Sequence, residues 1–307
     1  MKTPHEAADR IEGLFNITVT PFDKDGGVDN DALCASIDRV LNIGFDGLLI
    51  GGTYGEFSTM DNDERVTLFK TVMDHVGDKV PVLLCTAHSD SRVIFDLTEL
   101  AGNLGGLPMV TAPYVSEVND DHIYRFFKRV SGMSKTGIMI YNAPGIGITL
   151  SPQIICRLAE IDGMVALKQG DLNPTSIDIL ASQLHGKIRM LCASDLALLG
   201  PLAMGFDGVS STNSCALPEL IHSIYHAIKN GDATTAGHLQ RLWYPLRELA
   251  RKYGQPQTTK AIMDLRGWSG GGVRLPLLDL NADQKQQVRL ALEELSCNEA
   301  SSVSLVA

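Results

Sequence analysis

The sequence predicts an α/β fold, a (β/α)8 TIM barrel with a C-terminal helical extension. Short apolar runs recur along the 307 residues without polar alternation, which is typical of parallel strands that are buried on both faces. Segments with apolar residues at helical spacing lie between these runs. The alternation occurs eight times, whereas the alternative, a doubly wound open sheet, usually has fewer strands and an early glycine-rich phosphate loop.

The individual elements follow from this alternation. Helices are expected over Asp29–Ile43 and Asn62–Val76, where the apolar side chains share one stripe. Further helices are expected to start at Asn119 and at the Ser-Pro and Asn-Pro pairs of 151–152 and 173–174, because proline fits the first helical turn. The strands are expected at Phe15–Pro21, Gly47–Gly52, Pro81–Ala87, Leu107–Pro113, Gly137–Pro144, Met164–Gly170, Ile188–Ser194 and Gly208–Thr212.

The strand pattern stops after the eighth unit. Three later segments have helical spacing with no strand between them, namely Gly231–Tyr253, Thr258–Leu265 and Asn281–Leu295. We therefore predict three parts of the chain, a barrel over 13–230, a helical extension over 231–296 and a flexible tail of small and polar residues over 297–307.

Composition excludes several functional classes. The 26 basic and 36 acidic residues give a formal charge of −10, which argues against nucleic-acid or anionic-membrane partners, since these need a basic face. No apolar run reaches the length of about 18 residues that a membrane span needs, and the first residues lack the pattern of a secretory signal. The six cysteines form no C-x-x-C pair, so reduced thiols in a cytoplasmic protein are expected.

Lys168 is the unusual residue, because it lies inside the sixth expected strand. Catalytic groups of such barrels cluster at the carboxyl ends of the strands. Burying an ammonium group is costly, so the lysine must either find a carboxylate or lose its proton. A deprotonated lysine attacks carbonyls and forms Schiff bases. A structural ion pair or a side chain that reaches the surface is the alternative interpretation of Lys168.

Two other strand ends carry candidate groups. Tyr141 precedes an Asn-x-Pro turn, where it serves as an acid–base group or as a packed tyrosine. The turn over 52–55, with Thr53 between glycines, either cradles a carboxylate with its N–H groups and hydroxyl or is a plain tight turn. Glu56, which follows the turn, is expected to be structural rather than catalytic.

Taken together, G-T-Y-G-E at 52–56, Y-N-A-P at 141–144 and A-L-K at 166–168 resemble the dihydrodipicolinate synthase/N-acetylneuraminate lyase superfamily. The opening V-T-P-F and the late V-R-L-P also match, so the resemblance covers about residues 13–295. It implies a class I, metal-independent aldolase that needs no cofactor beyond a covalent Schiff base with its substrate. The family is commonly tetrameric, which implies a homotetramer built as a dimer of dimers.

The resemblance also implies roles for individual residues. Lys168 corresponds to the lysine that forms an imine with the keto carbon of a 2-oxo acid such as pyruvate. Tyr141 corresponds to the proton shuttle, and Thr53 is its expected relay partner. Substrate-binding positions implied by the resemblance are Gly52, Thr53, Tyr54 and Ser210. Family members usually have Thr or Ser in place of Tyr54, so the Tyr54 ring needs space that the smaller side chain does not.

Departures from the family pattern bear on the substrate. Dihydrodipicolinate synthases usually carry a second tyrosine where this chain has Val115 and an arginine where it has Ile146. Loss of that arginine removes a charge-assisted clamp on a carboxylate, a contact worth about 1.5–3 kcal/mol. Ser194 and Asp195 replace the acidic pattern of sialic acid lyases. We therefore expect carbon–carbon cleavage of a 4-hydroxy-2-oxo acid, specifically a 2-keto-3-deoxy sugar acid, to pyruvate and an aldehyde.

Other functions stay open at the level of the sequence. A dihydrodipicolinate synthase-like synthase, a dehydratase or a deaminase would use the same lysine imine on a related 2-oxo acid. A non-catalytic binder would require damage to the catalytic set, and none is visible. His222 and His226 have the i, i+4 spacing of metal ligands but no supporting carboxylates, so a surface helix is expected there rather than a class II metal site.

Overall fold

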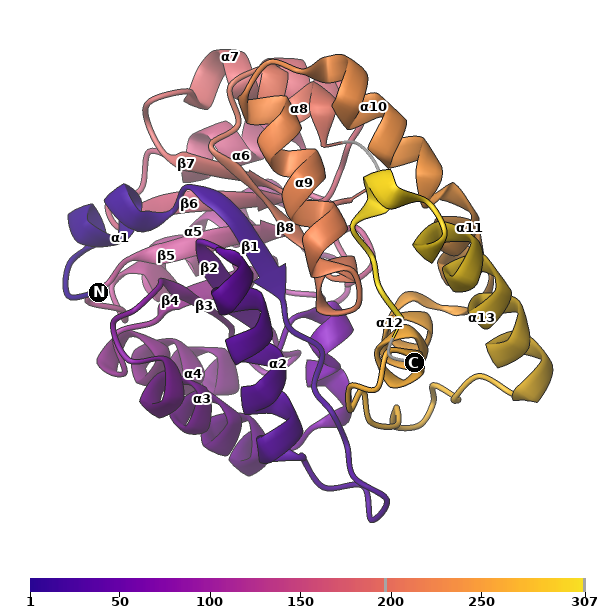
Figure 1. The fold of residues 1–307 in the computed structure, drawn as a ribbon. Coiled ribbons are helices and arrows are strands. Elements are labelled where there is room, and N and C mark those ends of the chain that lie inside the picture. The colour runs from indigo at the N-terminus through magenta and orange to yellow at the C-terminus, as the bar shows by residue number, and fades with distance from the viewer. Residues whose placement is uncertain (196–197, 306–307) are drawn as a thin grey trace.

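The fold is the predicted TIM barrel. In this computed structural model, which describes residues 1–195 and 198–305, eight parallel strands form a closed barrel in chain order. Helices surround the strands, and the helices after the eighth unit lie to one side of the barrel (Figure 1). The strands are β1 (Gly13–Ile17), β2 (Gly47–Ile50), β3 (Val82–Cys85), β4 (Leu107–Thr111), β5 (Ile138–Asn142), β6 (Met164–Gln169), β7 (Arg189–Cys192) and β8 (Gly208–Ser211).

Helices connect the strands and continue beyond the last one. The barrel helices are α1 (Pro4–Arg10), α2 (Asn30–Ile43), α3 (Asn62–Val76), α4 (Ser91–Asn103), α5 (Asp120–Ser131), α6 (Pro152–Leu158), α7 (Pro174–Leu184), α8 (Leu199–Ala203) and α9 (Pro218–Lys229). The later helices are α10 (Ala233–Leu242), α11 (Tyr244–Tyr253), α12 (Gln255–Leu265) and α13 (Ala282–Ser296). Short 3-10 turns are η1 (Thr53–Gly55), η2 (Phe57–Thr59), η3 (Asn213–Cys215) and η4 (Glu299–Ser301).

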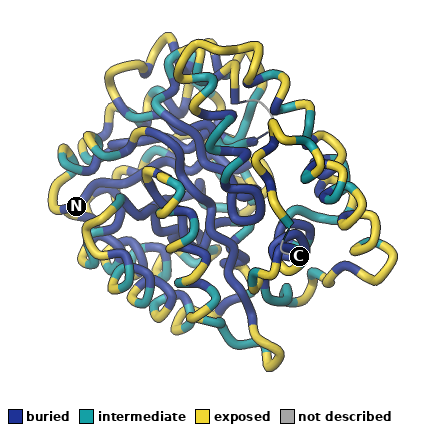
Figure 2. The backbone as a smooth tube through the Cα atoms, viewed as in Figure 1, coloured by how far each residue is buried: buried dark blue, intermediate teal, exposed yellow. Residues whose placement is uncertain are grey.

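Local chemistry explains where the helices begin. The N-cap of α3 is Asp61, whose side chain accepts from the Glu64 N–H while the Glu64 side chain accepts from the Asp61 N–H. In α6 and α7, proline lies in the first turn behind Ser151 and Asn173, whose side chains cap the helix ends. The strands are buried along nearly their whole length, so the core lies in and around the barrel (Figure 2).

The helix expected over 231–253 is two helices. The break falls at Trp243, which ends α10 and precedes α11. Pro245 lies in the first turn of α11, where its missing N–H costs nothing, whereas inside a continuous helix it would remove a hydrogen bond. Trp243 is buried, so the break also brings a large aromatic ring into the core.

Both ends of the chain contain structure that the pattern did not indicate. The helix α1 precedes the first strand, with Thr3 as its N-cap. In the segment predicted as a tail, η4 follows α13, and Ser301 and Val303 are buried. Residues 306–307 lie outside the described residues. The flexibility of this tail and the division of the chain at residue 230, which falls in the link between α9 and α10, stay predictions.

The extension reaches the functional end of the barrel through α12. This helix packs against η1, which follows β2, and against η3, which follows β8. Both turns lie at carboxyl ends of strands, where barrel enzymes place their active sites. Within the described residues, no helix is long and apolar enough to cross a bilayer.

Candidate active site

Lys168 and Tyr141 lie side by side inside the barrel. They are paired in register on the neighbouring parallel strands β6 and β5, so their side chains point the same way. The Nζ of Lys168 lies 4.2 Å from the centroid of the Tyr141 ring, within the range of a cation–π contact. Both residues are buried, with exposed fractions of 3% and 5%.

The environment of Lys168 favours its neutral amine. Burial lowers the pKa of Lys168 to about 8, and the weaker influence of nearby thiols and of Asp195 opposes that shift. None of the ion pairs formed among the described residues includes Lys168. The structural ion pair considered for this lysine is therefore not formed within the described chain. A buried lysine without a paired carboxylate has the properties of a carbonyl nucleophile.

Thr53 holds the phenol of Tyr141. Its Oγ1 lies 2.8 Å from the Tyr141 hydroxyl, and either atom can be the donor. Burial raises the pKa of Tyr141, so the free phenol stays protonated at neutral pH. Thr53 begins η1, and two hydrogen bonds secure this turn, one from the Glu56 N–H to the Thr53 carbonyl and one from the Thr20 hydroxyl to the Gly55 carbonyl.

A small cavity lies next to these groups, because its lining includes Tyr54, which follows Thr53, and Asp195, whose charge acts on the pKa of Lys168. Its volume is about 90 Å³, and its lining is largely polar, with Tyr54, Asp195, Ser210 and Gln255 among the residues. The Ser210 hydroxyl donates to the carbonyl of Cys192 at 3.4 Å. Burial, with a smaller contribution from Asp195, raises the pKa of the Tyr54 phenol, which therefore offers a hydroxyl at neutral pH.

The structure thus gathers the predicted residues at one end of the barrel. Lys168, Tyr141 and Thr53 form one contiguous group, and Tyr54 and Ser210 line the adjoining cavity. Gly52 begins the turn, and a Cβ there would lie only 2.7 Å from Cδ2 of Leu49, so a larger residue would force Leu49 to move.

Two positions differ from the family pattern, and they carry Val115 and Ile146. Val115 is exposed, with an exposed fraction of 52%, and Ile146 is half-buried against the core. Neither can supply the phenol or the guanidinium usual at these positions. Among the described residues, no three His, Cys, Asp or Glu side chains gather in a way that could hold a metal ion.

Asp195 and Gln255 also line the cavity. For Asp195, its place after the seventh expected strand allows either a hydroxyl-binding group or a turn residue. Its side chain is buried and accepts from the Asn213 amide at 2.6 Å, and burial raises its carboxyl pKa. Gln255 was missed, because it lines the cavity from the start of α12, far along the chain from the strand ends. No local pattern marks such a residue.

Comparison with known proteins decides the family. A model of the Dihydrodipicolinate synthetase family matches residues 10–295. The chain belongs to this family. The superfamily resemblance predicted from the motifs at the strand ends is thereby confirmed.

Relatives of this dihydrodipicolinate synthetase family member match over nearly their full length. The chain is 30% identical to 4-hydroxy-tetrahydrodipicolinate synthase 1 of Halalkalibacterium halodurans, over 92% of this chain and 96% of the relative. It is also 30% identical to 4-hydroxy-tetrahydrodipicolinate synthase of Bacillus velezensis, over 93% and 99%.

Solved structures of the family superpose closely on this chain. YagE of E. coli K12, a prophage protein of the dihydrodipicolinic acid synthase family in complex with pyruvate, gives a TM-score of 0.86 at 25% identity, covering 93% of this chain and 98% of that one. The chloride-inhibited dihydrodipicolinate synthase of Acinetobacter baumannii, also complexed with pyruvate, gives 0.86 at 25%, covering 93% and 99%. Pyruvate is thus bound by two similar proteins with the same barrel.

Proposed function

We propose that this protein is a class I aldolase or lyase that binds pyruvate as a Schiff base on Lys168. One observation carries the proposal: a buried lysine, without a carboxylate partner in the described chain, lies 4.2 Å from the ring of a tyrosine whose hydroxyl meets Thr53. The pyruvate complexes of two similar proteins support the choice of 2-oxo acid. No metal or separate cofactor takes part.

The chemistry begins at the amine. The Nζ of Lys168 attacks the keto carbon of the 2-oxo acid, and water leaves as the protonated imine forms. The imine then accepts the electron pair of the C3–C4 bond, while the C4 hydroxyl loses its proton and becomes the aldehyde. Protonation of the resulting enamine at C3 and addition of water to the imine release pyruvate and regenerate the free lysine.

Proton transfer in this scheme falls to Tyr141. Its phenol donates while water is lost from the carbinolamine and must accept a proton when the C3–C4 bond breaks. Because burial keeps the pKa of Tyr141 high, a partner has to take over its own proton as it accepts another. The Thr53 hydroxyl, 2.8 Å away, is suited to this relay. The N–H groups of the turn at Gly52 and Tyr54 are suited to hold the substrate carboxylate.

For the substrate, we propose a 2-keto-3-deoxy sugar acid. The polar cavity with Asp195, Ser210 and Asn213 can accept and donate hydrogen bonds to several hydroxyls. Ile146 leaves the chain without the arginine that suits the carboxylate of an amino-acid co-substrate. The second candidate is 4-hydroxy-tetrahydrodipicolinate synthesis, which the names of the relatives favour. A cytoplasmic location and a homotetramer remain predictions.

The test has two stages. Wild-type protein is incubated with pyruvate and cyanoborohydride, and the expected result is an added mass of pyruvate less one oxygen atom, mapped to the peptide with Lys168. Lys260 is the internal control, because it is a buried lysine held by a carboxylate and should stay unlabelled. Absence of an adduct at Lys168 would refute the Schiff-base proposal.

The second stage separates the two candidate reactions. Release of pyruvate and an aldehyde from 2-keto-3-deoxy sugar acids is expected, and turnover of pyruvate with aspartate semialdehyde is expected to be negligible. The opposite result would replace the aldolase proposal by the synthase, with the lysine imine retained.

A further inference from the structure

A buried ion pair joins the C-terminal helices to the turn that carries Thr53. The Nζ of Lys260, on α12, lies 2.6 Å from Oε1 of Glu56, and the two side chains are only 2% and 1% exposed. Desolvation of two charges offsets most of their attraction, so a buried pair adds little net stability, while removal of one partner is strongly destabilising. In some proteins a buried polar or ionic group of this kind specifies geometry rather than adding stability.

Glu56 has a backbone conformation that needs support. Its φ is +58°, in the left-handed region that residues other than glycine seldom adopt. From this position its N–H donates to the Thr53 carbonyl and closes η1. Its carboxylate is held from the C-terminal extension, because Oε2 accepts from the Arg274 N–H at 3.1 Å while Oε1 faces Lys260. Lys260 also donates to the Gly272 carbonyl at 2.6 Å.

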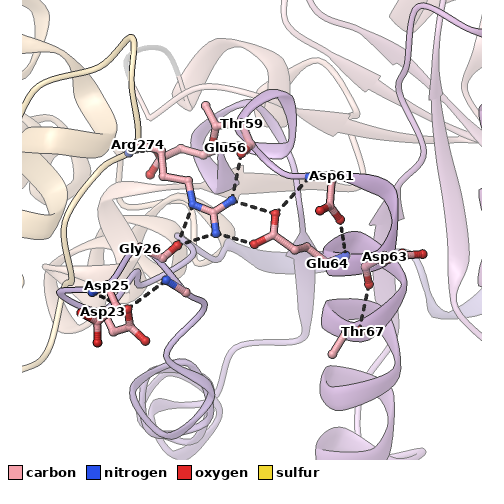
Figure 3. Close-up of polar contacts among 11 residues, drawn as sticks. Asp23, Asp25, Gly26, Glu56, Thr59, Asp61, Asp63, Glu64, Thr67 and Arg274 are labelled. Atoms are coloured by element: carbon pink, nitrogen blue, oxygen red, sulfur yellow. Dashed lines mark hydrogen bonds and ion pairs between the residues drawn. The ribbon is translucent and has the colours of Figure 1, made fainter.

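The Arg274 side chain bonds to the loop at Gly26, to η2 and to α3, as Figure 3 shows. Its guanidinium donates to the Thr59 carbonyl at 2.9 Å, to the Glu64 carboxylate at 2.8 Å and to the Gly26 carbonyl at 2.9 Å. The segment from Glu56 to Glu64 is therefore attached to residues 260–274 by several charge-assisted hydrogen bonds. The same helix α12 contributes Gln255 to the cavity, so one element both lines the pocket and supports the turn.

We propose that Glu56 and Lys260 are positioning residues that set the η1 turn so that the Thr53 hydroxyl reaches Tyr141. This inference rests on the proposed lysine-imine function. The link is short: Glu56 is three residues from Thr53, is bonded to its carbonyl, and is held by Lys260 from a helix more than 200 residues away in the chain. Loss of the pair frees η1, and the relay contact to Tyr141 at 2.8 Å is lost with it. Lys168, on β6, stays in place.

The test compares turnover with imine trapping in two variants. Glu56→Gln removes one charge at nearly constant size, and the double variant Glu56→Gln/Lys260→Met removes both, so no buried charge is left uncompensated. We expect aldol turnover of both to fall about 10- to 100-fold, within the range of lost acid–base help. At saturating pyruvate, the final extent of cyanoborohydride trapping on Lys168 should stay within about threefold of wild type, because Lys168 lies on β6 and excess pyruvate compensates for weaker holding of its carboxylate by the turn. If Glu56→Gln does not fold, the double variant decides the outcome.

Glu64→Gln is the matched control. It makes the same substitution on a partly exposed carboxylate, whose own hydrogen bonds come from the Arg274 guanidinium and the Asp61 N–H rather than from Glu56 or η1. We expect its turnover to stay near wild type.

Near-wild-type turnover of both the Glu56→Gln and the double variant would overturn the positioning role. So would parallel losses of turnover and trapping that follow thermal stability, which indicate a purely structural pair. Failure of wild-type protein to form any adduct would refute the proposed function instead, so the two results are distinguishable.

Discussion

The amine of Lys168 should titrate far below an ordinary lysine, and the pH dependence of imine formation measures this. Burial disfavours the ammonium form and lowers the pKa of Lys168 from 10.5 to about 8. At pH 7 about a tenth of the protein then carries the free amine, against about 3 in 10,000 for an unshifted lysine, a gain of about 300-fold in nucleophile. The shift corresponds to about 3 kcal/mol of differential interaction.

The assay is cyanoborohydride trapping at low pyruvate concentration, under conditions in which adduct formation limits the rate. The rate should rise about tenfold per pH unit below pH 8 and level off above it, because only the deprotonated amine attacks. A small-molecule amine with an ordinary lysine pKa serves as the control and should keep accelerating to pH 10. A protein rate that also keeps rising through pH 10 would refute the argument from burial.

The other predictions concern stability and proton transfer. Lys168→Met should abolish the adduct and raise the free energy of unfolding at pH 7 by up to about 3 kcal/mol, because the folded protein no longer holds a disfavoured ammonium. The folded pKa lies below the unfolded value, so wild-type stability rises between about pH 8 and 10.5, and urea denaturation should show the difference between variant and wild type shrinking over that window. The exposed Lys187→Met is the control and should change stability by less than about 0.5 kcal/mol. Tyr141→Phe should still form the pyruvate adduct to the wild-type extent, only more slowly because the phenol also assists loss of water, while turnover falls by about 10²–10⁴-fold; turnover near wild type would contradict its role as proton shuttle. Thr53→Val should show the same split with a smaller loss, and unchanged turnover would remove Thr53 from the relay.

Much of the architecture was predictable from periodicity. The helix expected over Asn62–Val76 is α3 with the same bounds, and each of the eight apolar runs overlaps a strand. The first strand is the exception in its bounds, since β1 starts at Gly13, two residues before the run expected at Phe15–Pro21, and ends at Ile17. These features are local: a helix needs a stripe of apolar residues and a cap, and a doubly buried strand needs a short apolar run. The break at Trp243 was missed because helical spacing continues through it, although Pro245 is compatible with the start of a second helix.

The site was predictable only in part. A lysine inside an apolar run can be recognised from the sequence alone, and the architecture of a TIM barrel places the carboxyl ends of its strands together. The distances between Lys168, Tyr141 and Thr53 required the strand register and the turn, which no single segment contains. Gln255 carries no signal at all, since its place in the cavity depends on how α12 packs against the barrel.

The kind of fold and the residue able to act as an amine nucleophile follow from the amino-acid sequence alone, because hydrophobic periodicity and the cost of burying a charge are properties of short segments. Which buried charges meet an opposite charge depends on the tertiary structure. Lys168 and Lys260 are both buried lysines, yet the folded chain brings Glu56 to Lys260 and no carboxylate within ion-pair distance of Lys168 among the described residues. That difference depends on groups far apart in the chain, since Coulomb attraction and desolvation act through space rather than along the backbone.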